Sequence, residues 1–125
     1  MEMLRKSVND FTASLASKAS VPGGGSASAL AGSLAAALGG MVGELTVGKE
    51  KYAAVDPILR ELLDEAETLR GRLLDCVEKD AAALAPLAKA YAIPKGDPQR
   101  AETLEACLTA AAAPPRCGLR ADATA

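Results

Sequence analysis

A glycine-rich loop is the part of this sequence best suited to bind a small molecule. It reads Val21-Pro22-Gly23-Gly24-Gly25-Ser26 and opens an uncharged stretch that ends before Glu44. Glycines let a backbone approach a ligand closely, and the free N–H groups at the start of the following helix attract an anionic or carbonyl-bearing ligand. Ser26 is a natural N-cap for that helix. The loop is therefore either a ligand-binding loop or a flexible linker that precedes a capped helix.

A second candidate is an aspartate on an otherwise apolar helical stripe. Steps of three and four residues from Leu73 pass through Cys76 and Asp80 and continue to Leu84. An aspartate that faces the core loses hydration, which favours its protonated form, and such an acid can donate a proton during catalysis. Two other interpretations stay open. Asp80 either pairs with a buried lysine or caps a neighbouring helix, or a kink at Pro86 rotates it to the surface.

Lysines occur at two further places where ligand contacts are common. Lys49 and Lys51 lie in the connection between the second and third predicted helices, and Lys95 follows the third. Most surface lysines are simply solvated, and these need not share an end of the molecule with the glycine-rich loop. The sequence Gly48-Lys49-Glu50 is not a nucleotide-binding P-loop, because no strand precedes it and neither Ser nor Thr follows the lysine.

Apolar periodicity and capping residues predict four helices that position these groups. No segment alternates in the manner of a strand, so we expect an all-α antiparallel bundle. The predicted helices run from about Glu2 to Lys18, from Ser26 to about Leu45, from Asp56-Pro57 with a late kink at Pro86 to Pro94, and from Asp97-Pro98 to about Ala111.

The second predicted helix has almost no polar side. Its large apolar residues share one face, Ala and Gly occupy the others, and we expect neighbouring helices or a partner subunit to bury it. Residues 19–43 are uncharged and long enough to span a bilayer. Ala, Gly and Ser provide little transfer free energy, however, and Pro22 shortens the usable run, so no membrane span is expected. The large apolar residues are Leu30, Leu34, Leu38, Met41 and Leu45.

Composition narrows the class of protein. The 125 residues suit one domain, and a net charge of −2 without a basic face argues against a nucleic-acid partner. The three cysteines, Cys76, Cys107 and Cys117, lack metal-site spacing, and there is no histidine. We therefore expect reduced thiols, no metal site and a cytoplasmic location. The N-terminal residues include Glu2, Arg5 and Lys6 and do not resemble a signal peptide.

The last residues differ in character from the rest. Pro114-Pro115 should end the fourth helix, and residues 116–125 show neither periodicity nor a cap. We divide the chain into a helical domain, residues 1–113, and an irregular tail, residues 114–125. The tail is either disordered, or foreign to the domain through a frameshift or truncation, or an ordinary frayed terminus.

Four blocks of sequence, in order and at compatible spacing, resemble one family. They are Pro22–Leu30, Leu45–Tyr52, Asp80 and Ala90–Lys95. Together they resemble the cyclodeaminase domain of formiminotransferase-cyclodeaminases and the related bacterial methenyltetrahydrofolate cyclohydrolases, over roughly residues 1–113. The resemblance implies an all-helical homodimer whose substrate is a tetrahydrofolate derivative and which needs no metal or redox cofactor. The implied reaction is closure of 5-formimino-tetrahydrofolate to the 5,10-methenyl form with loss of ammonia, or interconversion of the methenyl and 10-formyl forms.

The resemblance also implies roles for particular residues. Asp80 would donate a proton to the departing amine. The chain departs from the family at Leu84, where phenylalanine is usual, and after the fourth helix, where further helices with a second polar motif are expected. We therefore expect a truncated member, with an inactive copy or a non-catalytic helical interaction module as the alternative. The residues implied to face the folate are Pro22, Gly23, Gly24, Gly25, Ser26, Lys49, Lys51 and Lys95.

Overall fold

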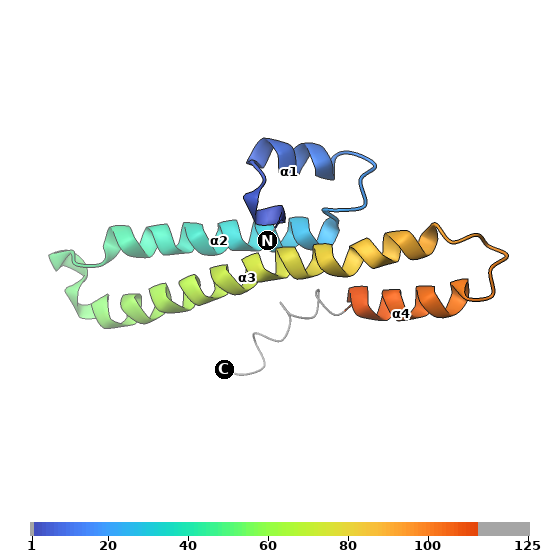
Figure 1. The fold of residues 1–125 in the computed structure, drawn as a ribbon. Coiled ribbons are helices and arrows are strands. Elements are labelled where there is room, and N and C mark those ends of the chain that lie inside the picture. The colour runs from blue at the N-terminus through green and yellow to red at the C-terminus, as the bar shows by residue number, and fades with distance from the viewer. Residues whose placement is uncertain (1, 113–125) are drawn as a thin grey trace.

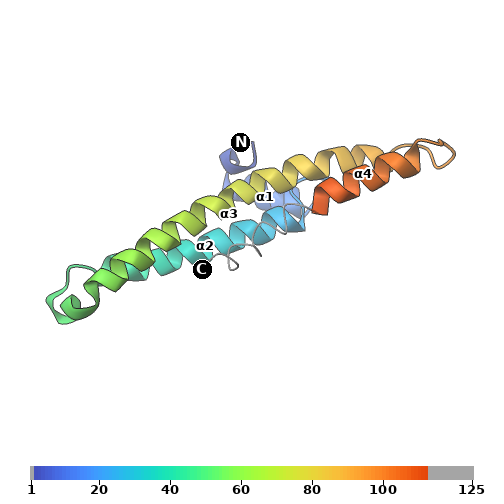
Figure 2. The ribbon, with the colours of Figure 1, turned by 90° about the horizontal axis from the view of Figure 1, so that it is seen from below.

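A computed structural model describes residues 2–112 of the chain, and within this range it contains helices and connecting segments but no strand. The all-α prediction is confirmed. α2 and α3 form a long antiparallel hairpin, α4 folds back along the C-terminal part of α3, and η1 with α1 lies beside the first half of α2 and the middle of α3 (Figures 1 and 2). The elements are the 3-10 helix η1 (Met3–Arg5), α1 (Val8–Leu15), α2 (Gly24–Thr46), the 3-10 helix η2 (Glu50–Val55), α3 (Asp56–Tyr91) and α4 (Arg100–Ala112).

The first predicted helix is wrong in its extent. The structure divides it into η1 and α1, and the chain is extended at Lys6 between them. The Ser7 side chain accepts a hydrogen bond from the backbone N–H of Asp10, which starts α1 as a true N-cap. The apolar stripe through Leu4 and Phe11 is periodic across this break, so periodicity alone did not reveal it.

The start of α2 also differs from the prediction. Its N-cap is Gly23 and the helix begins at Gly24, so Ser26 lies inside the first turn and is not the cap. Gly23 has no side chain to accept a hydrogen bond, and the acceptor comes instead from α3. The prediction of a helix starting at Asp56-Pro57 is confirmed, although its N-cap is Val55, and α3 continues through Pro86 to Tyr91. The fourth helix begins at Arg100 and not at Asp97-Pro98 as predicted.

α2 and α3 approach each other through glycines of α2. A Cβ placed on Gly32 would lie 3.2 Å from Cδ1 of Leu73, and one on Gly43 would lie 2.6 Å from Cδ2 of Leu63. The leucines of α3 thus pack directly against the bare backbone of α2. The face of α2 that carries Leu34 and Leu38 points away from α3, and both side chains are 59% exposed.

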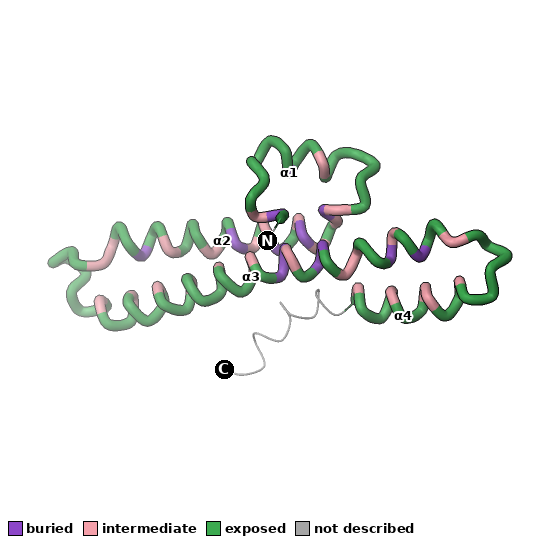
Figure 3. The backbone as a smooth tube through the Cα atoms, in the orientation of Figure 1, coloured by how far each residue is buried: buried purple, intermediate pink, exposed green. Residues whose placement is uncertain are grey.

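The buried core lies where η1, α1, the first half of α2 and the middle of α3 meet. Figure 3 shows buried residues gathered there, while the second half of α2 and the first half of α3 are mostly exposed. The core is therefore concentrated around the end of the hairpin that carries the glycine-rich loop. Its cluster of buried side chains consists of Met3, Phe11, Ala29, Cys76, Val77 and Ala81.

Two predictions made from the sequence are left without a structural test. Residues 114–125, predicted as an irregular tail, lie outside the described residues. Within residues 2–112, α2 is the one helix that is long and apolar enough to cross a membrane by length and composition, and little of it is buried inside a single chain. The predicted absence of a membrane span thus remains a prediction.

Candidate active site

Asp80 of α3 holds the first turn of α2. Its Oδ2 accepts a hydrogen bond from the backbone N–H of Ser26 at 2.9 Å, and the Ser26 hydroxyl lies 3.2 Å from the same oxygen. The backbone donors of a first helical turn have no partner within their own helix, and a carboxylate near them is favoured by the helix dipole. Asp80 therefore acts as an N-cap for α2, although it lies 54 positions after Ser26 in the chain.

This contact decides among the interpretations that the sequence left open for Asp80. Asp80 is only 4% exposed, so it faces the core, and rotation to the surface by Pro86 is wrong. The structure shows the capping of a neighbouring helix, and no salt bridge to Asp80 occurs among residues 2–112. A cap and a proton donor are compatible roles, because capping occupies one carboxylate oxygen.

The second carboxylate oxygen, Oδ1, is oriented toward Gly25. A Cβ added to Gly25 would overlap Oδ1 and would lie 2.5 Å from Cγ of Asp80. No group among residues 2–112 donates a hydrogen bond to Oδ1, and in that range no fully buried side-chain oxygen or nitrogen lacks a partner. The remaining exposure of Asp80 therefore includes Oδ1, which is the oxygen able to meet a ligand.

The other loop residues surround this carboxylate unevenly. Pro22 is buried behind a cis Val21–Pro22 peptide bond, and a Cβ on Gly23 would lie 2.5 Å from Cδ1 of Leu84. Gly24 is exposed, and a Cβ there would have no neighbour within 4 Å among the described residues. Gly24 thus offers open backbone beside the site, whereas Gly23 and Gly25 are glycines because α3 packs against them.

Ser26 does not face a ligand with its side chain. The residue is fully buried, and its hydroxyl donates to the backbone carbonyl of Val77 at 2.8 Å or to Asp80. Sequence reasoning missed Val77, although a signal was present. Val77 lies three residues before Asp80 and so on the same side of α3, where its carbonyl adjoins whatever Asp80 touches.

The three lysines are not brought to this site within one chain. Lys49 and Lys51 follow the C-terminal end of α2, whose 23 residues span about 34 Å from the glycine-rich loop. Lys95 lies beyond the end of α3, which continues eleven residues past Asp80. All three are exposed. Of the predicted site residues, the structure thus joins Pro22–Ser26 with Asp80 and leaves the lysines apart.

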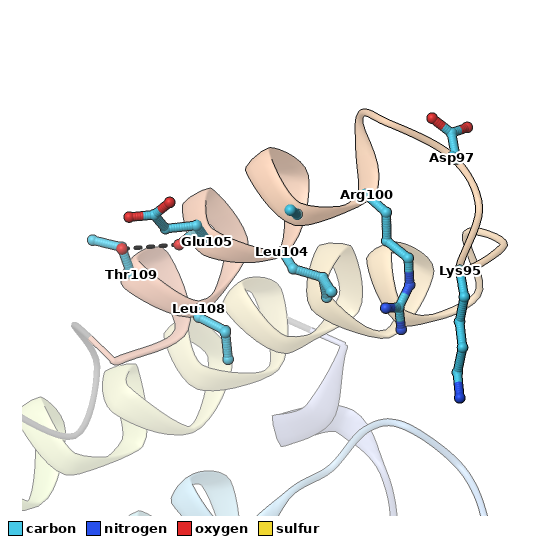
Figure 4. A pocket seen from close by; sticks show the side chains of 8 residues that line it. Lys95, Asp97, Arg100, Leu104, Glu105, Leu108 and Thr109 are labelled. Atoms are coloured by element: carbon cyan, nitrogen blue, oxygen red, sulfur yellow. Dashed lines mark hydrogen bonds between the residues drawn. The ribbon is translucent and has the colours of Figure 1, made fainter.

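Two of these lysines, Lys95 and Lys49, line shallow hollows of their own. Lys95 borders one of about 430 Å³ between the α3–α4 connection and α4, together with Arg100 and two acidic side chains, Asp97 and Glu105 (Figure 4). Lys49 borders another of about 230 Å³ with Gly48 and Asp56. Neither hollow contains the Asp80 carboxylate.

These features describe an all-α protein whose candidate site is a glycine-rich helix start capped by a buried carboxylate. Sequence comparison identifies its family. The profile described as formiminotransferase-cyclodeaminase matches residues 7–121, and the chain belongs to this family. The resemblance stated from the four sequence blocks is thereby confirmed, and the matched range extends beyond residue 113.

Relatives with established names agree with this assignment. The methenyltetrahydrofolate cyclohydrolase of Methylorubrum extorquens is 37% identical over 117 residues, which cover 90% of this chain and 56% of that protein. The formimidoyltransferase-cyclodeaminase of Dictyostelium discoideum is 40% identical over 102 residues, 82% of this chain and 19% of that protein. The Gallus gallus protein of the same name is 32% identical over 100 residues, 80% and 18% respectively. The chain thus spans about half the length of the first relative and about a fifth of the other two.

Proposed function

We propose that this chain catalyses a one-carbon reaction of tetrahydrofolate, with Asp80 as the group that transfers the proton. The observation that carries the proposal is the buried Asp80 carboxylate, with Oδ2 fixed by Ser26 and Oδ1 directed to the glycine-rich loop. Family membership supplies the substrate class, because the relatives are named as a methenyltetrahydrofolate cyclohydrolase and formimidoyltransferase-cyclodeaminases.

In the cyclodeaminase reaction, N10 of 5-formimino-tetrahydrofolate attacks the formimino carbon, its own proton passes to the imino nitrogen, and an aminal-like intermediate with an amino group forms. Asp80 gives its proton to the amine nitrogen, the C–N bond breaks with its electron pair on nitrogen, and ammonia leaves. In the cyclohydrolase reaction, the Asp80 carboxylate takes a proton from the water that attacks the methenyl carbon. Both reactions proceed by proton transfer and consume no redox equivalents, so we propose that the substrate is bound without a metal or redox cofactor.

The rest of the substrate needs polar partners away from Asp80. The exposed backbone at Gly24, in the first turn of α2, is suited to carbonyl oxygens of the pterin ring. Lys49, Lys51 and Lys95 carry the positive charge that would attract the carboxylates of the glutamate tail. Because Lys49 and Lys51 are about 34 Å from the loop in one chain, their participation requires a second subunit.

The apolar face of α2 supports a homodimer. Leu34, Leu38, Met41 and Leu45 follow steps of four, three and four residues, which is the spacing of a helix–helix seam, and each is more than half exposed. The spacing reads the same in both directions. An antiparallel second copy therefore sets Leu34 against the partner's Leu45 and Leu38 against the partner's Met41, as a two-fold interface requires.

This pairing would complete the site across subunits. When α2 lies antiparallel to the partner's α2 in this register, position 49 falls opposite the partner's position 30, so the residues just beyond its C-terminal end come within about two turns of the partner's glycine-rich loop. Lys49 and Lys51 of one subunit would then bind the folate whose reacting carbon lies near the partner's Asp80. The same pairing covers the apolar face of α2, which supports a cytoplasmic homodimer with no membrane partner. The net charge of −2 also argues against a nucleic-acid partner.

The test is an assay of the purified chain with both folate substrates, alongside Asp80→Asn and a matched control. Asp75→Asn makes the same change on the same helix at an exposed position. We expect Asp80→Asn to abolish turnover while 5-formyl-tetrahydrofolate still raises the melting temperature, since a ligand of the native state stabilises it. Equal turnover in Asp80→Asn and Asp75→Asn would remove Asp80 from the mechanism. Absence of both turnover and a melting shift in the unchanged protein would favour the interaction module.

A shared site has its own test. Asp80→Asn and the double variant Lys49→Ala, Lys51→Ala should each be inactive alone. Co-expressed, they form mixed dimers in which one site has both an intact Asp80 and intact lysines, so about a quarter of the unchanged activity should return. A second mixture, in which Lys95→Ala replaces the double variant beside Asp80→Asn, serves as a comparison. No recovery in the mixture would contradict a site built from two subunits.

A further inference from the structure

The hydroxyl of Ser26 has two acceptors and only one proton. Its Oγ lies 2.8 Å from the carbonyl oxygen of Val77 and 3.2 Å from Oδ2 of Asp80. A serine hydroxyl donates to one acceptor at a time, and the shorter distance is typical of O–H donation whereas the longer one is not. In the structure the hydroxyl proton of Ser26 is therefore assigned to the hydrogen bond with the Val77 carbonyl. Rotation about the Cβ–Oγ bond would direct this proton to Asp80.

Because of the surroundings of Ser26, rotation of its hydroxyl changes the hydrogen bonding of Asp80 but not contacts with water or a substrate. Ser26 is 0% exposed, so neither water nor a substrate competes for its hydroxyl. Its backbone N–H donates to the same oxygen, Oδ2, at 2.9 Å. The opposite oxygen, Oδ1, is the one that remains open to a ligand. Ser26 thus contacts the side of Asp80 that does not exchange the proton.

We propose that Ser26 is a positioning residue whose hydroxyl stabilises, by a hydrogen bond, the negative charge that forms on Asp80 during the proposed reaction. The inference rests on the proposed role of Asp80 as proton donor. Before transfer, the proton is on Oδ1, Oδ2 accepts the Ser26 N–H, and the hydroxyl donates to Val77. When the proton passes from Oδ1 to the departing amine, Asp80 becomes a carboxylate and the Ser26 hydroxyl turns to donate to Oδ2.

This rotation would affect the chemical step more than binding. The carboxylate charge develops only as the amine leaves, so the new hydrogen bond stabilises the transition state and not the bound substrate. Hydrogen bonds to charged groups are stronger than those between neutral groups. Removal of the hydroxyl should therefore lower kcat and leave KM nearly unchanged, although Ser26 never touches the folate.

The experiment compares Ser26→Ala with Ser33→Ala. Ser33 is a buried serine of the same helix, 3% exposed, whose hydroxyl donates to the carbonyl of Leu30 in its own helix and not to Asp80. With 5-formimino-tetrahydrofolate, we expect kcat of Ser26→Ala to fall about tenfold with KM within twofold. Ser33→Ala should keep both constants. Should Ser26→Ala unfold at the assay temperature, Ser26→Cys retains the side-chain shape with a weak donor, and the same loss of kcat is expected.

The outcomes separate this inference from the proposed function. Equal kcat for the Ser26 and Ser33 variants, while Asp80→Asn is inactive, would overturn the role of Ser26 and leave that of Asp80 intact. A raised KM with unchanged kcat would mean that Ser26 supports binding and would also overturn it. Unchanged turnover in Asp80→Asn would instead refute the proposed function on which the inference rests.

Discussion

The α-carbon of Gly25 lies directly against the carboxylate of Asp80, so closely that a Cβ on Gly25 would stand 2.5 Å from Cγ of Asp80. The first turn of α2 therefore contacts the middle of α3 through the Asp80 side chain, with no side chain of α2 between them. The cap on α2 and the orientation of Oδ1 both depend on this contact. Glycine at position 25 is therefore required by the partner helix, whatever the loop binds.

Gly25→Ala should displace Asp80 and destabilise the fold. Overpacking of a filled site costs about 1–3 kcal/mol, and the added methyl group has no free volume to occupy. Gly24→Ala is the control, because its Cβ meets no atom within 4 Å among the described residues and alanine restricts the unfolded chain. Urea unfolding of both variants measures the difference. A Gly25→Ala protein as stable as Gly24→Ala would contradict the contact.

Removal of the Asp80 side chain should cost stability as well as activity. Asp80→Ala leaves the Ser26 N–H buried without an acceptor, which costs about 1–3 kcal/mol. Asp80→Asn should cost less, since an amide oxygen can still accept that bond. Asp75→Ala, at an exposed position on the same helix, controls for the substitution itself. Denaturant titration of the three variants should rank Asp80→Ala as the least stable.

Leu38→Glu should dissociate the proposed dimer. Leu38 is 59% exposed in one chain and lies at the centre of the apolar seam, where a two-fold axis places the new charge twice. We expect the dimer dissociation constant to rise by at least about a hundredfold. Val8→Glu introduces the same charge at an apolar position that is 82% exposed and lies on α1. Light scattering should give a monomer for Leu38→Glu and a dimer for Val8→Glu.

A carboxylate at the far end of the hairpin should make stability depend on pH. The backbone N–H of Gly48, which adopts a left-handed φ of 79°, donates to Asp56, and this bond followed by the Arg60 guanidinium lowers the pKa of Asp56 below its ordinary value of 3.8. Because the folded pKa is the lower one, the stabilisation is present above pH 3.8 and is lost as the pH falls through the folded value.

The measurement is the melting temperature of the unchanged chain and of Asp56→Asn between pH 7 and pH 2. The unchanged chain should have the higher melting temperature at pH 7, and the difference between the two melting temperatures should narrow only below about pH 4. Asp64→Asn, an exposed position on α3, should show no such narrowing of its gap. A gap for Asp56→Asn that stays constant to pH 2 would refute the contribution of the Gly48 and Arg60 contacts.

The sequence was informative about helices and about Asp80 because both leave a local signal. Helical periodicity located α2, α3 and α4, and it singled out Asp80 as a polar residue on an apolar stripe. The N-cap of α2 was misplaced because its acceptor comes from a distant helix, and nothing near Ser26 in sequence reveals it. The face of α2 that α3 would cover was equally hidden. Both leucine and glycine faces suit helix packing, and only the tertiary structure shows that the glycine face was used.

The cap on α2 also bears on the order in which the chain acquires structure. Three consecutive glycines are poor at starting a helix, and the acceptor that compensates for them is synthesised more than fifty residues later. A nascent chain that stops short of Asp80 therefore lacks what fixes the beginning of α2. The glycine-rich loop adopts a defined conformation only when α2 and α3 pair as a hairpin, so ordering of this region is tied to completion of α3.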